Sequence, residues 1–269
     1  LGRSWSWIAV MAVILAALVG IGEMVRGSGA QRTGWSGFPL LSALLLVPLI
    51  GMIAALRVRQ ARTVFALGLM GAIVELILSV LALIRFQPHA PGMQFVEQAA
   101  ILPWLGVHLG IDGLSVLFLP LTALLTLFVI LYAQPHHRER PGAFVASALA
   151  LEAALMGMFT ALNLLQFWLF ALIEVIPAAF LIARYGTSPG RSRAAWQFVR
   201  SMLGGLAMLL AGIVLLGWNH AAATNGAWSF DLTTLLETPV PEGRQSLIFI
   251  LLFAGLAVRL AQGSRTDGR

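Results

Sequence analysis

Hydrophobic residues along the chain gather into eight stretches, each close to the roughly 20 residues needed to cross the hydrocarbon core of a bilayer. The stretches lie at about residues 5–25, 38–56, 63–84, 114–133, 143–162, 164–183, 201–218 and 245–261. Polar residues, prolines and glycines fill the segments between them. This pattern predicts an all-α polytopic membrane protein, a bundle of about eight transmembrane helices.

The composition favours the same class. Of the 269 residues, 59% are hydrophobic and 10% are charged, well below the roughly 25% charge of soluble domains. Cysteine is absent, which excludes disulfides and thiolate ligands within this sequence. The formal net charge of +6 would suggest a nucleic-acid partner in a soluble protein, but the arginines lie in short loops between apolar stretches. We therefore expect contacts with the lipid bilayer and no nucleic acid.

The arginines are distributed unevenly between alternate loops. Twelve of the 17 lie on one side, in the segments 1–4, 57–62, 134–142, 184–200 and 263–269. An excess of basic residues marks the cytoplasmic side, so both termini are predicted to be cytoplasmic. The outer loops at 85–113 and 219–244 are expected to fold over the opposite face. The predicted location is a bacterial inner membrane or an equivalent energy-transducing membrane.

The chain is expected to have three parts. Residues 1–34 hold an additional anchor helix, which we interpret as uncleaved because no convincing small-residue cleavage site precedes Gly27–Ala30. Residues 35–262 form the helix bundle, and residues 263–269 form a polar tail.

Four ionisable residues lie well inside the apolar stretches: Glu75, Glu152, Glu174 and Arg259. Each costs about 2.5–3.5 kcal/mol at the centre of a membrane helix, so all four should face protein rather than lipid. Two interpretations remain open at this point. The residues are either members of a proton relay, with pKa values tuned by burial and by a nearby cation, or a static Glu–Arg pair that fixes the packing of two helices.

Pro177 lies three residues after Glu174, inside the same apolar stretch. A proline frees the carbonyl four residues earlier, here that of Ile173, and favours a kink. A kink beside a carboxylate would make room for a water molecule, as a proton path requires. Arginine argues against a relay through Arg259 itself, because its guanidinium effectively never releases a proton.

The sequence offers no sign of a catalytic centre, metal site or cofactor site. No two of the five histidines have the i, i+4 spacing of a helical metal site, and we expect them in solvated loops or near the outer face. They are His89, His108, His136, His137 and His220. Phosphate-binding loops, dinucleotide fingerprints and nucleophile elbows are also absent from the sequence. We predict no cofactor and no catalytic centre of its own.

Two segments carry a resemblance to a known family. HLGIDGLSVLFLPLTALLTLFVILYA, at His108–Ala133, resembles the G-(I/V)-D-G-L-S signature of the antiporter-like subunits of respiratory complex I. Residues Glu152–Gly186 resemble the family pattern that runs through a conserved proline, here Pro177. The resemblance covers roughly Phe38–Ala261 and is greatest to the M-type subunits, called subunit 4 in mitochondria, and to photosynthetic relatives. Asp112, within the signature, is expected to cap the helix that follows it.

The chain departs from the family pattern at several positions. The pump glutamate of the family corresponds to Leu172, and Glu174 corresponds to the second carboxylate of the photosynthetic form. Asn163 stands where the family has aspartate, and Gln197 where lysine is usual. A family lysine that pairs with the pump glutamate corresponds to Arg259. The resemblance implies the front half of an antiporter-like fold, after which the family continues with several more helices.

These departures lead to a functional hypothesis and an alternative. The main hypothesis is a structural or assembly subunit of a larger hetero-oligomeric membrane complex, related to NADH-quinone oxidoreductase, with proton pumping lost or incomplete. The alternative is a subunit that translocates protons together with a separate chain supplying the missing helices. In either case other membrane subunits are the expected partners.

Overall fold

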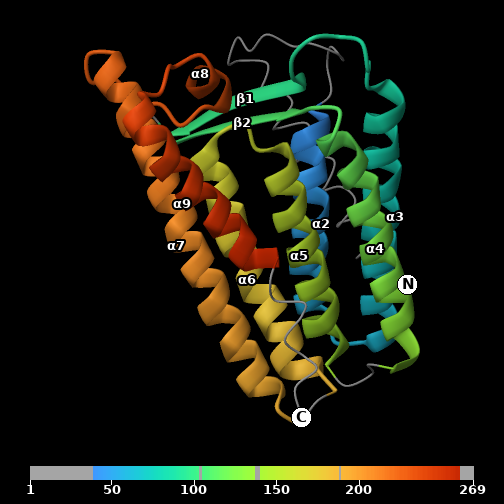
Figure 1. Cartoon of the computed structure of the whole chain (residues 1–269). Coiled ribbons are helices and arrows are strands. Elements are labelled where there is room, and N and C mark those ends of the chain that lie inside the picture. The colour runs from blue at the N-terminus through green and yellow to red at the C-terminus, as the bar shows by residue number, and fades with distance from the viewer. Residues whose placement is uncertain (1–38, 103–104, 137–139, 188, 261–269) are drawn as a thin grey trace. The chain divides into compact units, whose positions relative to one another are not determined.

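The computed structural model describes residues 39–102, 105–136, 140–187 and 189–260 (Figure 1). The predicted anchor helix at 5–25 and the predicted polar tail lie outside these residues. The described residues divide into two compact units, unit 1 up to Ala161 and unit 2 from Leu162 onward.

Four long helices make up most of unit 1. They are α2 (Leu40–Arg57), α3 (Ala61–Arg85), α4 (Ser115–His136) and α5 (Pro141–Thr160). Each begins and ends within three residues of a predicted stretch, because the polar and arginine-rich connections interrupt the apolar runs where the sequence indicates. Helix α5 packs against all three of the others and is the most buried of the four, so it forms the centre of unit 1.

A two-stranded antiparallel hairpin lies in the predicted outer loop at 85–113. Strand β1 (Gln94–Leu102) pairs with β2 (Leu105–Ile111), and both strands contact α2 (Figure 1). From the sequence, this loop was expected to fold over one face of the bundle, and strands within it were not predicted. A signal was present, since Leu105, Val107, Leu109 and Ile111 alternate with glycine and histidine at the period of a strand. The fold class is nevertheless all-α, with this small sheet as an addition.

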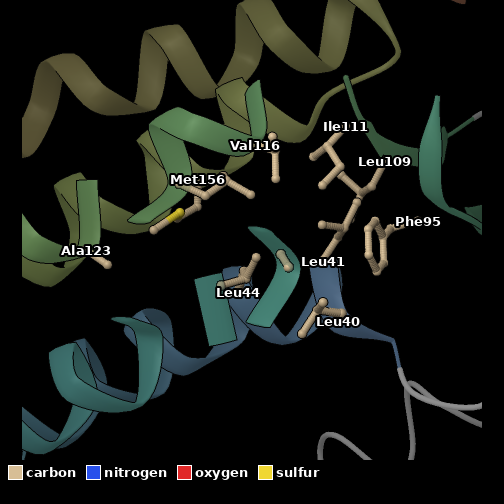
Figure 2. Close-up of a cluster of buried hydrophobic side chains, with 11 residues drawn as sticks. Leu40, Leu41, Leu44, Phe95, Leu109, Ile111, Val116, Ala123 and Met156 are labelled. Carbon is tan, nitrogen blue, oxygen red and sulfur yellow. The ribbon is translucent and has the colours of Figure 1, made fainter. Parts of the chain in front are cut away.

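The hydrophobic core of unit 1 lies where the hairpin meets the ends of the helices. Figure 2 shows side chains from α2, both strands, α4 and α5 turned toward one another. The cluster is formed by Leu40, Leu41, Leu44, Ala82, Phe95, Leu109, Ile111, Val116, Leu119, Ala123 and Met156. Each large side chain fully buried in such a core contributes about 1.5–3 kcal/mol, so this cluster holds the hairpin on the helix ends.

The hairpin also supplies a polar contact that the helices need. Glu97 on β1 is buried, and its Oε1 accepts a hydrogen bond from the backbone N–H of Leu41 at 2.8 Å. Its Oε2 accepts from the backbone N–H of Ser42 at 2.9 Å and from the Ser42 hydroxyl at 2.6 Å. Pro39 at the N-cap position of α2 makes no side-chain cap hydrogen bond. Glu97 therefore caps α2 from a distant part of the chain, where the helix dipole favours a carboxylate.

Unit 2 contains α6 (Leu164–Tyr185), α7 (Arg191–Ala223), α8 (Leu232–Leu236) and α9 (Glu242–Leu260). Helix α7 begins ten residues before the predicted stretch at 201–218, because the arginine-rich sequence from Arg191 contains no residue that breaks a helix. The predicted loop at 184–200 is therefore much shorter. Helix α8 lies within the predicted outer loop at 219–244, and α9 covers most of the last predicted stretch.

Within the described residues, the six helices α2 to α7 are long and apolar enough to cross a membrane. The prediction of an all-α polytopic membrane protein is confirmed. The sidedness of the chain and the predicted total of about eight spans stay predictions. The first predicted stretch lies outside the described residues, and α9, over the last predicted stretch, is not among the six helices.

Two glycines set the close approach of α7 and α9, which lie side by side in Figure 1. A Cβ atom on Gly205 would lie 2.8 Å from the carbonyl oxygen of Gly255, and a Cβ on Gly255 would lie 2.8 Å from the carbonyl oxygen of Gly205. The neighbouring Gly204 has nothing within 4 Å of its Cβ position. Of the adjacent residues Gly204 and Gly205, only Gly205 provides the small surface that lets membrane helices pack closely.

We predict opposite effects for Gly205→Ala and Gly204→Ala. The first forces α7 and α9 apart, at a cost of about 1–3 kcal/mol for overpacking. The second fills open space and gains up to about 1 kcal/mol of helix propensity. Thermal unfolding of the two variants in the same detergent measures the difference. Equal melting temperatures would contradict the packing described for Gly205.

Removal of the Glu97 carboxylate should expose the start of α2. Glu97→Ala deletes the acceptor of three hydrogen bonds, and loss of a helix cap costs about 1–2 kcal/mol. Ser42→Ala, the matched control, removes only one of the three. Hydrogen exchange at the amides of Leu41 and Ser42 should accelerate strongly in the first variant and little in the second. Unchanged protection in Glu97→Ala would show that α2 is capped in another way.

Candidate functional site

The start of α6 places Glu174 within its helix. Asn163 is the N-cap residue, and its Oδ1 accepts hydrogen bonds from the backbone N–H groups of Leu165 at 3.0 Å and Gln166 at 3.2 Å. An asparagine performs this task as well as an aspartate, so the departure from the family pattern at this position keeps the cap. Helix α6 then continues without interruption through Pro177, which is buried.

Glu174 on α6 forms an ion pair with Arg259 on α9. The guanidinium Nη2 of Arg259 donates a hydrogen bond to Oε2 of Glu174, at a distance of 2.5 Å. The side chain of Glu174 is 17% exposed and that of Arg259 is 11% exposed. A carboxylate and a guanidinium at this depth neutralise each other, and each would be costly to leave alone. The pair ties α9 to α6 within unit 2.

A second polar contact fixes the other side of α6. The indole Nε1–H of Trp168 donates a hydrogen bond to the backbone carbonyl of Leu206 on α7, at 2.8 Å. The sequence analysis did not single out Trp168, although a tryptophan away from a membrane interface needs an acceptor for its N–H. Helix α6 is thus joined to α7 by Trp168 and to α9 by Glu174.

Unit 1 holds the other two predicted residues. Glu75 on α3 and Glu152 on α5 are 0% and 1% exposed and lie close enough to interact electrostatically. Their four carboxylate oxygens have no hydrogen bond of normal geometry from any described residue. The buried hydroxyl of Thr126 on α4 lies beside Glu152. The partner of Glu75, which the sequence left open, is therefore a second carboxylate.

The four membrane-depth residues thus form two pairs of different chemistry. Glu174 and Arg259 lie within unit 2 and have opposite charges, whereas Glu75 and Glu152 lie within unit 1 and have like charges. The first pair can bind helices together without any change of protonation. The second needs a proton, or a ligand of positive charge, to avoid two uncompensated charges in a medium of low dielectric constant.

Asp112 stands before the start of α4. Its Oδ1 accepts hydrogen bonds from the backbone N–H groups of Ser115 at 2.7 Å and Leu114 at 3.2 Å. Partial burial acts to raise the pKa of Asp112, but these backbone amides outweigh it and hold the pKa below its ordinary value. The cap therefore stabilises the fold above the unfolded pKa of the carboxyl, and this contribution is lost as the pH falls through the lowered value.

His220, which was expected near the outer face in the predicted loop at 219–244, lies in the last turn of α7 instead. It is buried, and its Nδ1 is 2.8 Å from the hydroxyl oxygen of Thr238. The neighbouring Asn219 donates to the carbonyl of Pro239 at 3.1 Å. Both side chains hold the segment before α9 against the end of α7. Among the described residues, no cluster of three or more histidine, aspartate or glutamate side chains is placed to hold a metal.

Comparison with known proteins identifies a family. Residues 161–264 match the family model described as NADH:quinone oxidoreductase/Mrp antiporter, TM. The chain is 31% identical over 225 residues to NADH-ubiquinone oxidoreductase chain 4 of Arabidopsis thaliana. The matched region covers 82% of this chain and 44% of that protein. It is 32% identical over 206 residues to NADH-quinone oxidoreductase subunit M of Rhodobacter capsulatus, covering 72% of this chain and 38% of the relative.

The fold is also similar to a solved structure. A chain of respiratory complex I from Thermus thermophilus with bound NADH superposes with a TM-score of 0.65 at 29% identity, over 82% of this chain and 43% of that one. This chain therefore spans less than half the length of the relatives that it matches.

Breaking the ion pair of unit 2 should destabilise it, whereas replacing the whole pair should not. Glu174→Leu or Arg259→Met alone leaves one buried charge without a partner and should cost roughly 3 kcal/mol. The double variant removes both charges and should recover most of that loss. Glu242→Gln, at an exposed position in the first turn of α9, is the control. Melting temperatures that fall additively in the double variant would argue against the pair.

Proposed function

Because this chain belongs to the antiporter-like membrane subunits of complex I and related enzymes, of the M-type or mitochondrial chain 4 kind, we propose that it serves as a structural or assembly subunit of a larger membrane complex. In this proposal its own proton pumping is lost or incomplete. The host complex resides in an energy-transducing membrane, and a bacterial inner membrane is the location we favour.

The observation that carries the proposal is the ion pair between Glu174 and Arg259. A proton carrier must alternate between two protonation states at a reachable energy. Arginine does not do so, because its guanidinium effectively never releases a proton. A carboxylate bound to the guanidinium is one half of an ion pair, which is costly to break at a buried position. The pair is suited to binding α6 to α9, and it is poorly suited to passing protons.

Leu172 supports the same conclusion. It occupies the position at which the resemblance expects the pump carboxylate. Residues i and i+2 of a helix point about 200° apart, so Glu174 does not present its carboxylate in the direction that a carboxylate at position 172 would take. Its side chain nevertheless reaches Arg259, at the position of the family lysine, and forms an ion pair with it.

The exposed faces of unit 2 fit a membrane subunit with neighbours. On α6, Ile173, Ile176 and Phe180 are exposed, and on α9 the rings of Phe249 and Phe253 stack on each other while remaining largely exposed. Such apolar faces are stable against lipid hydrocarbon or against helices of another membrane subunit. We propose both as partners, since the relatives bear the names of subunits of NADH-quinone and NADH-ubiquinone oxidoreductases.

One observation favours the alternative function, proton translocation together with another chain. The Nη1 atom of Arg259 is buried and has no hydrogen-bond partner among the described residues. A carboxylate or carbonyl oxygen of another chain would accept a hydrogen bond from this Nη1 and would weaken the ion pair of Arg259 with Glu174. Such a partner would release the carboxylate of Glu174 from the ion pair, as the alternative function requires.

Glu174→Gln in the host complex separates the two functions. The scaffold proposal expects less assembled complex, because the charge of Arg259 is left alone, with proton pumping per assembled complex unchanged. The Glu174→Leu, Arg259→Met double variant should restore assembly and leave pumping intact. The measurements are the yield of purified complex and the quenching of a pH-sensitive dye in inverted vesicles.

Glu242→Gln should leave both assembly and pumping as in the wild type. Normal assembly with pumping lost in Glu174→Gln and in the double variant would overturn the scaffold proposal and establish the relay with a separate chain.

A further inference from the structure

We propose that Glu75 and Glu152 form a proton-binding site inside unit 1, in which the two carboxyl groups share a dissociable proton. The site involves neither residue of the Glu174–Arg259 pair. It goes beyond the scaffold function and is tested independently of it.

The packing of α3 against α5 brings the two carboxyl groups together. Gly68 of α3 lies against Val145 of α5, and Gly71 lies against Leu149. At both contacts the residue numbers of the two partners differ by the same amount, within one residue, so the two helices run parallel in a constant register. Continued by one more turn, this register places Glu75 opposite Glu152. The glycines allow this approach because they have no side chain to hold the helices apart.

Helices α2 to α5, which make up most of unit 1, offer no cation to the pair. Every other titratable residue of α2 to α5 lies in the first or last turn of its helix or has a largely exposed side chain: Arg57, Arg62, Arg85, Tyr132 and His136. Glu75 and Glu152 lie in the middle portions of α3 and α5. Within the described helices of unit 1, an ion pair of the kind seen in unit 2 is therefore not available to Glu75 and Glu152.

Two buried carboxylates without a nearby cation and without a hydrogen bond of normal geometry are an unfavourable arrangement. Each ionised carboxylate costs several kcal/mol when it is taken out of water without a partner. A proton on one of them removes that charge and creates a donor for the oxygen of the other. Charge-assisted O–H···O⁻ bonds are also among the strong hydrogen bonds of proteins. One proton thus removes one of the two negative charges and supplies the missing hydrogen bond.

A bound metal cation would fit the same residues less well. Calcium requires about six to eight oxygen ligands and magnesium about six. Beside the carboxylates, the adjacent polar group that the structure places there is the hydroxyl of Thr126. A proton requires only the two carboxyl oxygens, so it is the ligand that matches the donor set.

Infrared spectroscopy of the purified chain in lipid nanodiscs tests the site. A protonated carboxyl group gives a C=O stretching band, distinct from the bands of a carboxylate, that shifts in D₂O. We expect this band at neutral pH in the wild type and in Glu174→Gln, and its loss at alkaline pH. The double variant Glu75→Gln, Glu152→Gln should lack it, because both amides are neutral and nearly isosteric with a protonated carboxyl.

A milder variant keeps the test valid if the double variant folds poorly. Thr126→Val conserves shape and removes the hydroxyl beside Glu152, so it should shift the frequency of the band and retain its intensity. Circular dichroism confirms equal helix content.

Three results would overturn the proposal. The first is a neutral-pH spectrum without a carboxyl band that depends on Glu75 and Glu152. The second is a band that neither exchanges in D₂O nor responds to pH, which indicates a permanent structural hydrogen bond. The third is a band abolished by sodium or calcium at constant pH, which indicates a cation site.

Discussion

The cost of holding a carboxylate away from water governs this structure more than any other constraint. The chain meets it in three different ways. Glu97 accepts hydrogen bonds from the free backbone amides at the start of α2, and Glu174 forms an ion pair with Arg259. Glu75 lies close to Glu152. The first two arrangements compensate a full negative charge and bind separate elements together. In the third, the negative charge is not compensated until a proton binds. This difference distinguishes the two structural contacts from the proposed proton-binding site.

Most of the helical architecture could be predicted from the sequence, because in lipid the backbone must satisfy its own hydrogen bonds and apolar length alone marks a span. The limits of α2 to α6 follow from arginine-rich or turn-forming connections. The start of α7 was mispredicted, because the polar and arginine-rich residues from Arg191 onward form a helical extension before its apolar part. The hairpin was missed since its period-2 pattern is short and lies in a segment rich in turn residues.

The candidate sites show where sequence reasoning stops. Position within an apolar stretch sufficed to single out the four membrane-depth residues, because their burial cost depends only on depth. Their pairing depends on how each helix is rotated about its axis and on contacts such as Gly68 against Val145, which no local pattern contains. Glu97 lay in a predicted outer loop, where a carboxylate is ordinary, and its importance follows from amides 55 and 56 residues earlier in the chain. The motifs identified the family correctly, since their spacing is independent of packing.

The cap on α2 has a consequence for how the protein is made. The amides of Leu41 and Ser42 are synthesised well before the carboxylate that receives them, and α3 lies between them in the chain. During synthesis, these two amides therefore lack their native acceptor until β1 has been made. The native cap of α2 is completed only after the hairpin has joined unit 1, and a ribosome that pauses before Glu97 leaves that helix end without it.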